Sequence, residues 1–229
     1  TRALGLAMKA DFLSRYLDLE VGGEYRYHPL DAGKRALRNQ CLRYLTAAGS
    51  ATAIDLATKQ FEHAGNMTER YGALAALVQS DAPARVGALE AFHQRYRDDA
   101  LVLDKWFQLQ AGAWRWSDAA PATLDQVRAL MDNPAFSLSN PNKVYALLRT
   151  FGANHRHFHA ADGAGYRFVA EQIVRLDPIN PQVASRLARS FDRWKRFDSE
   201  RQRHSRAALE SVCSQPGLSR DVFEVVDKA

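Results

Sequence analysis

The stretch LRNQCLRYLTAA, residues 37–48, decides the fold class. Its apolar residues Leu37, Cys41, Tyr44, Leu45 and Ala48 recur at intervals that place them on one face of an α-helix. Gly and Pro are few, with 13 and 8 residues, and the composition is rich in good helix formers. The sequence therefore predicts helix at this point and favours helix elsewhere.

Stripes of the same spacing follow along the chain and are predicted to form the core. They are Met67, Tyr71, Leu74 and Val78; Val102, Trp106, Leu109 and Ala113; Val144, Leu147, Leu148 and Phe151; Tyr166, Val169, Ala170, Ile173 and Leu176; and Val183, Leu187, Phe191 and Trp194. Helix pairs are expected to begin near Asp31, Asn66 and Asp99, 35 and 33 residues apart, which is typical of helix-hairpin repeats. We therefore expect an all-α superhelical array of antiparallel helix pairs, an armadillo- or HEAT-like α-solenoid, with residues 1–229 as a single helical-repeat domain.

The composition is that of a globular protein, with 46% hydrophobic and 25% charged residues. No window has the roughly 18 uncharged apolar residues of a membrane span, and no signal peptide opens the chain, so no membrane partner is expected. The two cysteines, Cys41 and Cys213, lie far apart in the sequence, which fits a reducing, cytoplasmic location. Since the chain begins at Thr1 within a helical pattern, we expect it to be a piece of a longer protein.

The net charge of +5 comes from one neighbourhood of the chain. Residues 186–206 contain eight Lys or Arg and three acids, so the rest of the chain is neutral. This distribution favours a solvated or acid-paired helix face over phosphate binding, and no nucleic-acid partner is expected.

No catalytic motif is present in the sequence, and no catalytic residue is assigned. No H-E-x-x-H, P-loop, G-x-S-x-G or dinucleotide fingerprint occurs. A metal ion is conceivable at His155, His157, His159 and Asp162, but only if the side chains of alternate residues converge. The favoured interpretation is a loop that caps neighbouring helices, and no metal site is assigned.

Two predicted helices begin with the same dipeptide, Asn140-Pro141 and Asn180-Pro181. A capping Asn before a Pro leaves free N–H groups at the positive end of the helix dipole, which can bind an anion. Gln182 and Arg186 share one helix face, and Lys143 lies just inside the other start. Either the two ends converge on a cationic pocket, or they are ordinary caps with salt bridges.

Several motifs in order resemble the C-terminal end of bacterial aminopeptidase N, a zinc-dependent alanyl aminopeptidase of the gluzincin group. They are NMTERYGAL (66–74), NPNKV (140–144), FHAADGAGY (158–166), NPQVASRL (180–187) and RWKRFD (193–198) with Arg201-Gln202. The residues of these motifs that the resemblance marks as structural are Asn140, Phe158, His159, Asp162, Gly163, Tyr166 and Asn180.

The resemblance implies a non-catalytic domain that closes over a catalytic domain of the same polypeptide and admits peptide substrates. Zinc and its H-E-x-x-H ligands would lie in that absent domain, so this chain alone holds no cofactor and is expected to be inactive. The implied distal subsite comprises Gln182, Arg186, Tyr145, Asn142 and Lys143, with Tyr145 at a position where bacterial relatives often have Arg. The alternative function is a free-standing helical-repeat module for protein–protein interaction.

Overall fold

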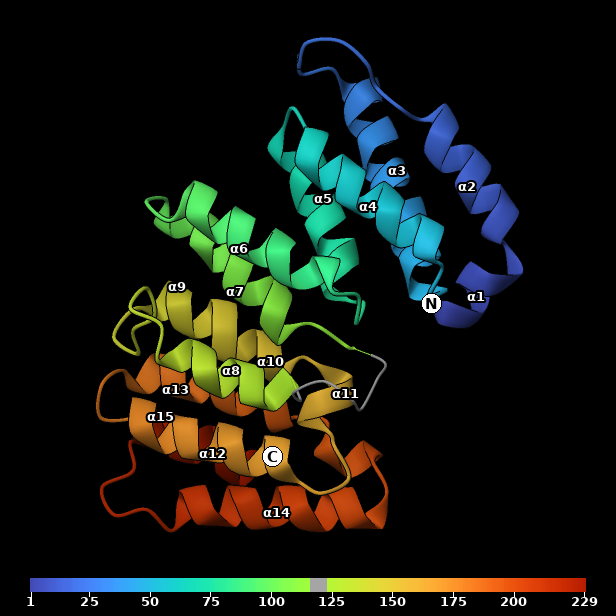
Figure 1. Ribbon diagram of the computed structural model, residues 1–229. Coiled ribbons are helices and arrows are strands. Elements are labelled where there is room, and N and C mark those ends of the chain that lie inside the picture. Colours follow the sequence, from blue (N-terminus) through green and yellow to red (C-terminus); the bar gives the residue numbers. More distant parts are fainter. Residues whose placement is uncertain (116–122) are drawn as a thin grey trace. The chain divides into compact units, whose positions relative to one another are not determined.

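The computed structural model describes residues 1–115 and 123–229, and every regular element in these ranges is a helix (Figure 1). The described residues fall into two compact units, of which the first comprises residues 1–97 with Arg115 and the second comprises residues 98–114 with 123–229. The assignment of the whole chain to one domain therefore stays a prediction.

The helices of the first unit are α1 (Arg2–Ala7), α2 (Lys9–Asp18), α3 (Pro29–Ala47), α4 (Ala51–His63), α5 (Met67–Val78) and α6 (Ala84–Tyr96). The α-helices of the second unit are α7 (Ala100–Ala111), α8 (Thr123–Met131), α9 (Pro141–Val144), α10 (Thr150–Gly152), α11 (His155–Phe158), α12 (Ala164–Leu176), α13 (Pro181–Ala188), α14 (Ser199–Cys213) and α15 (Arg220–Lys228). A π-helical turn, η1 (Tyr145–Arg149), continues α9, and the 3₁₀ turns η2 (Arg189–Phe191) and η3 (Trp194–Arg196) follow α13.

The predicted starts of the helix pairs are confirmed. α3 begins at Pro29, two residues before Asp31. The Asn66 side chain accepts from the Glu69 backbone N–H at 3.0 Å and caps α5. Asp99 caps α7 by accepting from the N–H groups of Leu101 and Val102, each at 3.1 Å. Capping groups of this kind satisfy N–H groups that have no partner within the helix.

The predicted core is right for the last three stripes and only partly right for the earlier ones, in which Leu37 is exposed and Val102 and Leu109 are half-buried. The last three predicted stripes are fully buried, with Val144, Phe151, Tyr166 and Ile173 at 0% exposure. In α3, however, Leu37 is 48% exposed, whereas Leu42, which the stripe omits, is completely buried. The reason is that α3 packs against both α2 and α5, so its buried surface is wider than one stripe and is rotated away from Leu37.

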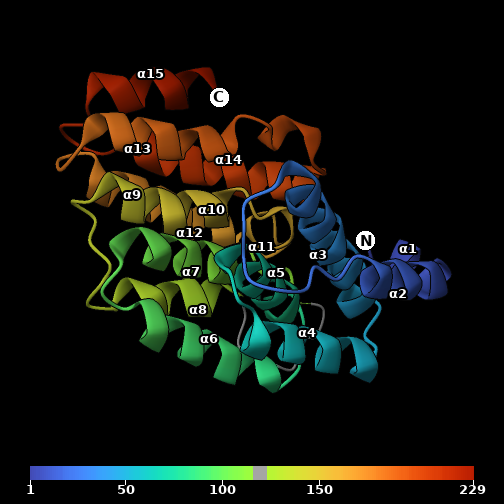
Figure 2. The same cartoon turned by 90° about the horizontal axis from the view of Figure 1, so that it is seen from above.

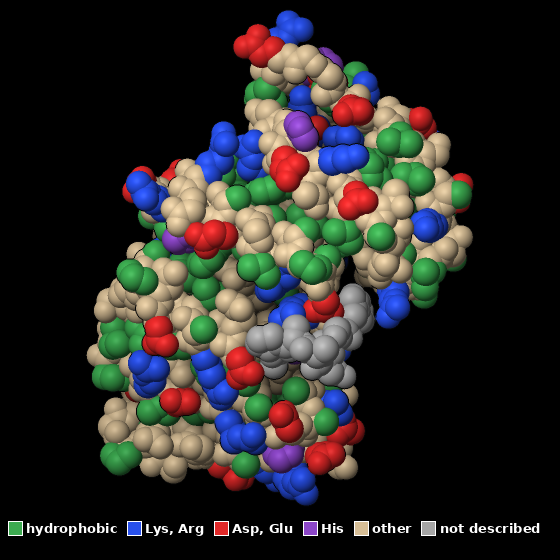
Figure 3. Space-filling model, viewed as in Figure 1, with side chains coloured by type: hydrophobic (Ala, Val, Ile, Leu, Met, Phe, Trp, Pro, Cys, Tyr) green, Lys and Arg blue, Asp and Glu red, His purple; other side chains and the backbone are tan. Residues whose placement is uncertain are grey.

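In the second unit, α12 packs against α13 and α14, and α13 packs in turn against α15 (Figure 2). This packing places the outward face of α13 beside α15. No helix among the described residues is long and apolar enough to cross a membrane. On the face seen in Figure 3, basic and acidic side chains are interspersed with hydrophobic ones rather than gathered into a field of one sign.

Candidate functional site: a cationic groove beside α13

Helix α13 is held in register by its cap and its buried face. Asn180 accepts from the Val183 backbone N–H at 3.1 Å, and Pro181 takes the first helical position. Val183 and Leu187 point into the core, which turns Gln182 and Arg186 outward to solvent. The local sequence thus fixes both predicted side chains on the exposed face of one short, rigid helix.

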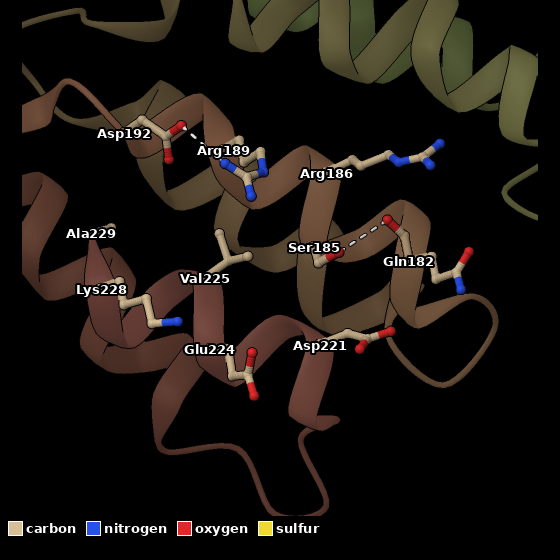
Figure 4. A pocket seen from close by; sticks show the side chains of 10 residues that line it. All are labelled: Gln182, Ser185, Arg186, Arg189, Asp192, Asp221, Glu224, Val225, Lys228 and Ala229. Atoms are coloured by element: carbon tan, nitrogen blue, oxygen red, sulfur yellow. Dashed lines mark hydrogen bonds and ion pairs between the residues drawn. The ribbon is translucent and has the colours of Figure 1, made fainter.

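A groove of about 710 Å³ lies between α13 and α15 (Figure 4). Gln182, Arg186 and Arg189 line one wall, and the ordinary surface helix α15 supplies the other. The α15 wall carries charges of both signs, contributed by Asp221, Glu224 and Lys228. Polar side chains therefore dominate the groove, which suits a polar ligand better than an apolar one.

Arg186 reaches across to the π-helical turn that follows α9. Its guanidinium donates to the Tyr145 hydroxyl at 2.9 Å, and the guanidinium carbon of Arg149 lies 5.7 Å from the centre of the Tyr145 ring. Among the described residues, no carboxylate lies within 4.0 Å of Arg186. The Arg186 charge is therefore paired only with a neutral hydroxyl and stays available to an anion.

A second cavity of about 390 Å³ adjoins the groove and shares three of its residues, Arg186, Arg189 and Asp192. Arg149 and Arg193 also line this cavity, together with His155 and His159. Asp192 is the only carboxylate in the lining, and it pairs with Arg189 at 3.8 Å. Arg186 thus lies at the junction of two cavities in a locally positive field.

The other predicted helix start has a different surrounding. Asn140 accepts from the Asn142 backbone N–H at 3.0 Å and caps α9, and the Asn142 side chain is exposed. The Lys143 ammonium turns inward, where it lies 2.7 Å from an Asp104 carboxylate oxygen and donates to the Ala100 carbonyl at 2.8 Å. Since the side chain is buried inside the unit, Lys143 lines neither cavity beside α13, and its charge is neutralised by Asp104.

The structural residues of the second unit form a buried ring cluster. Phe158 meets the Tyr166 ring edge-on at 5.1 Å, and His159 stacks on Phe197 at 3.8 Å. Burial raises the pKa of Tyr166 to about 12 and, with the nearby charges of His155 and Arg201, lowers the pKa of His159 to about 4. The Tyr166 hydroxyl therefore keeps its proton and His159 is neutral near pH 7, and a hydrogen bond of 2.8 Å joins the hydroxyl to His159 Nδ1.

Asp162 and Gly163 make the turn that enters α12. Asp162 accepts from the Ala164 backbone N–H at 3.0 Å. Gly163 has a φ of +69°, and a Cβ at this position would lie 2.6 Å from the His204 ring, so a larger residue does not fit. Asp162 and Gly163 therefore both shape the entry into α12.

The segment from His155 to Phe158 is a helical turn, α11, rather than the loop predicted from the sequence. The reason is a local cap, since the Asn154 side chain accepts from the His157 backbone N–H at 3.4 Å. His157 Nε2 bonds the Trp114 carbonyl at 2.9 Å, while His159 faces Tyr166. Within the described ranges, no group of three or more His, Cys, Asp or Glu side chains comes close enough to hold a metal ion.

The sequence analysis missed two contributions to the site, which are Arg149 in the second cavity and the α15 wall of the groove. Arg149 stands four residues after Tyr145 and so shares its helix face, a signal that could have added it to the site. The wall from α15 gave no such signal, because its nine residues show only a surface helix with Val222 and Val226 turned inward. Its place beside α13 depends on the tertiary fold.

Comparison with known proteins identifies relatives along the entire chain. The model of a protein family described as a domain of unknown function (DUF3458_C) with ARM repeats matches residues 1–229. Aminopeptidase N of Escherichia coli (strain K12) is 40% identical over 230 residues, covering 100% of this chain and 26% of that protein. Aminopeptidase N of Caulobacter vibrioides is 38% identical over 213 residues, covering 93% of this chain and 24% of that protein.

Among solved structures, Legionella pneumophila aminopeptidase A in complex with aspartic acid superposes with a TM-score of 0.86 at 33% identity. The match covers 99% of this chain and 27% of that one. These findings confirm the resemblance to the C-terminal domain of aminopeptidase N and the all-helical repeat array. The chain spans about a quarter of the length of the curated relatives it matches.

Proposed function

Because the chain belongs to the family described as a domain of unknown function (DUF3458_C) with ARM repeats, we propose that it is the C-terminal, non-catalytic domain of a cytoplasmic zinc aminopeptidase. Its similarity to aminopeptidase N over its whole length supports this proposal. In the proposed role the domain encloses the active-site cavity of the longer protein, limits the size of entering peptides and binds their distal end.

The hydrolytic chemistry is assigned to the part of the polypeptide outside this chain, where zinc would activate the attacking water. The described residues bring no metal-binding cluster together, so none of them is given a role in that step. The purified 229-residue chain is accordingly expected to leave alanyl-p-nitroanilide intact.

The groove beside α13 is proposed as the distal peptide subsite, and the position of Arg186 carries this proposal. Its guanidinium is exposed, lacks a carboxylate partner among the described residues and lies at the junction of two cavities lined by further arginines. The C-terminal carboxylate of a short peptide would supply the missing anion. Gln182 on the same helix face would bind a backbone amide, and the Tyr145 hydroxyl would hold the guanidinium in place.

The test is Arg186→Ala in the full-length enzyme, with di- and tripeptides compared against amino-acid anilides. A charge-assisted contact that is partly solvated contributes about 1–3 kcal/mol, so KM for free peptides should rise roughly 5- to 100-fold with little change in kcat. Anilides lack the carboxylate and should be unaffected. Arg203→Ala is the matched control, since it removes an exposed cation of the same unit that lines neither cavity. Equal losses on peptides and anilides in the Arg186 variant would reject the subsite.

A further inference from the structure

A polar cavity of about 450 Å³ lies within the first unit, well apart in sequence from the groove beside α13. Its lining residues come from the end of α2, the loop between α2 and α3, the first half of α3, the end of α4 and the start of α5. Two arginines of α3, Arg35 and Arg38, line it, and both are almost completely buried at 4% and 7% exposure. The surroundings of these two cations differ sharply.

Arg38 is fully partnered. Its guanidinium lies 3.4 Å from the Glu20 carboxylate and 3.5 Å from the Glu69 carboxylate, and its Nε donates to the Tyr16 carbonyl at 3.2 Å. The Tyr16 ring covers its face, with the guanidinium carbon 4.4 Å from the ring centre. Both acidic side chains that line the cavity are thus engaged by Arg38.

Arg35 has no such partners. Among the described residues, no carboxylate lies within 4.0 Å of its guanidinium, and its buried Nε–H donates to no acceptor. Its one contact of note is the Tyr25 ring, whose centre lies 4.9 Å from the guanidinium carbon. Arginine remains protonated in proteins, and a buried charge that lacks a counter-ion is costly, so an anion is missing from this arrangement.

The other polar groups of the cavity do not compete for that anion. Gln60 accepts from the Tyr16 hydroxyl at 3.0 Å and donates to the Asn39 side chain at 2.7 Å and to the Glu69 carbonyl at 2.9 Å. Lys59 adds a second positive charge at the exposed rim. The cavity therefore offers one unpaired interior cation and one cation at the mouth.

We propose that this cavity is a carboxylate-binding site in which Arg35 is the anion-binding group. A planar carboxylate matches the fork of N–H donors at the edge of a guanidinium, and Tyr25 leaves that edge free because it covers the face. A phosphate dianion fits less well, since Glu20 and Glu69 line the same cavity and would repel its second charge. The ligand is a small organic acid or the C-terminus of a short peptide, and the site is independent of the proposed distal subsite at Arg186.

The site can be tested by NMR titration of the ¹⁵N-labelled 229-residue chain, following the arginine Nε–H signals. N-acetylglycine is the small-acid probe, triglycine is the peptide probe, and N-acetylglycinamide is the neutral control. The Arg35 signal, identified by its loss in Arg35→Gln, should shift with N-acetylglycine, with triglycine, or with both, and should not shift with the amide. Inorganic phosphate should bind more weakly than the carboxylate.

Arg35→Gln should weaken carboxylate binding at least tenfold, as measured through the backbone amide signals of the cavity. The matched variant Arg43→Gln removes an exposed arginine of the same helix that does not line the cavity, and it should leave binding unchanged. Arg35→Gln should also be no less stable than the wild type, because it removes a buried cation that has no counter-ion. Should that variant fail to fold, Arg35→Lys keeps the charge but loses the planar fork and should still weaken binding severalfold.

Equal shifts with the acid and the amide, undiminished binding in the Arg35 variants, or no binding of either acid would overturn the proposal. Failure here leaves the Arg186 kinetics untouched, so the two proposals are judged separately.

Discussion

The starts of α9 and α13 share the same Asn-Pro signature but place their cations in opposite environments. In α9, the Lys143 side chain is buried against Asp104 of α7. In α13, the Arg186 side chain is exposed to solvent and contacts only the hydroxyl of Tyr145. The acid that decides between the two outcomes comes from a helix distant in sequence, so an anion-binding motif at a helix start becomes structural when a neighbouring element supplies the anion.

The largest expected effect lies on the buried side of this comparison. Lys143→Met leaves the Asp104 carboxylate without its partner in a site where the side chains are 7% and 16% exposed. Removing one member of a buried pair costs about 3–5 kcal/mol, so the free energy of unfolding in urea should fall by that amount. Arg186→Met is the matched control and should change it by less than about 0.5 kcal/mol.

A double variant sharpens the same point. Lys143→Met combined with Asp104→Leu removes both charges, and it should recover most of the lost stability because no uncompensated charge remains. A double variant as unstable as Lys143→Met would mean that the loss comes from the contacts of the ammonium with the Ala100 carbonyl and the Phe107 ring, and not from the unpaired Asp104 charge.

The second expected effect concerns pH and the buried ring cluster. The His159 pKa is lowered to about 4 in the folded protein, mainly by burial, so the unfolded chain takes up a proton first as the pH falls below about 6.5. Stability is therefore full above pH 6.5 and declines as the pH falls toward 4, by on the order of 3 kcal/mol. Urea unfolding between pH 7 and pH 4 measures this loss.

His159→Gln is the control for that experiment. The glutamine oxygen can accept the Tyr166 hydroxyl but does not titrate in this range. The variant should show a shallower decline of stability between pH 6.5 and pH 4, and an unchanged decline would assign the effect to other groups.

The sequence alone was enough for the helical class, the starts of the helix pairs and the last three buried stripes, from Val144 onward. These features depend on local caps and on periodicity, as Asn66 and the stripe of α12 show. It was insufficient for the exposure of Leu37 and for the surroundings of Lys143 and Arg35, because these depend on which helices pack against α3 and α9. Within the site, the pairing of Arg186 with Tyr145 joins residues 41 positions apart and has no local signature.

A smaller effect is expected from the caps themselves. Asn140→Ala and Asn180→Ala each remove an acceptor for helix N–H groups, and each should lower the free energy of unfolding by about 1 kcal/mol. The corresponding Gly variants should cost only a few tenths of a kcal/mol, since Gly leaves those N–H groups open to water. Similar losses at both sites would show that the two starts are alike as caps and differ only in what surrounds their cations. A loss of stability at only one of the two sites would show that the two helix starts are not equivalent as caps.

The smallest expected effect is the coupling between Arg186 and Tyr145, and it decides whether the groove is open to a ligand. A double-mutant cycle with Arg186→Gln and Tyr145→Phe isolates the energy of their 2.9 Å hydrogen bond. Because the Arg186 side chain is exposed, the coupling energy in urea unfolding should be about 0.5 kcal/mol or less. The cycle for Lys143 and Asp104 should give a several-fold larger value. A coupling of about 2 kcal/mol or more at Arg186 would mean that the guanidinium is locked in the fold like Lys143. Arg186 would then have a structural role, and Arg186→Ala should lower stability and impair the turnover of peptides and anilides alike.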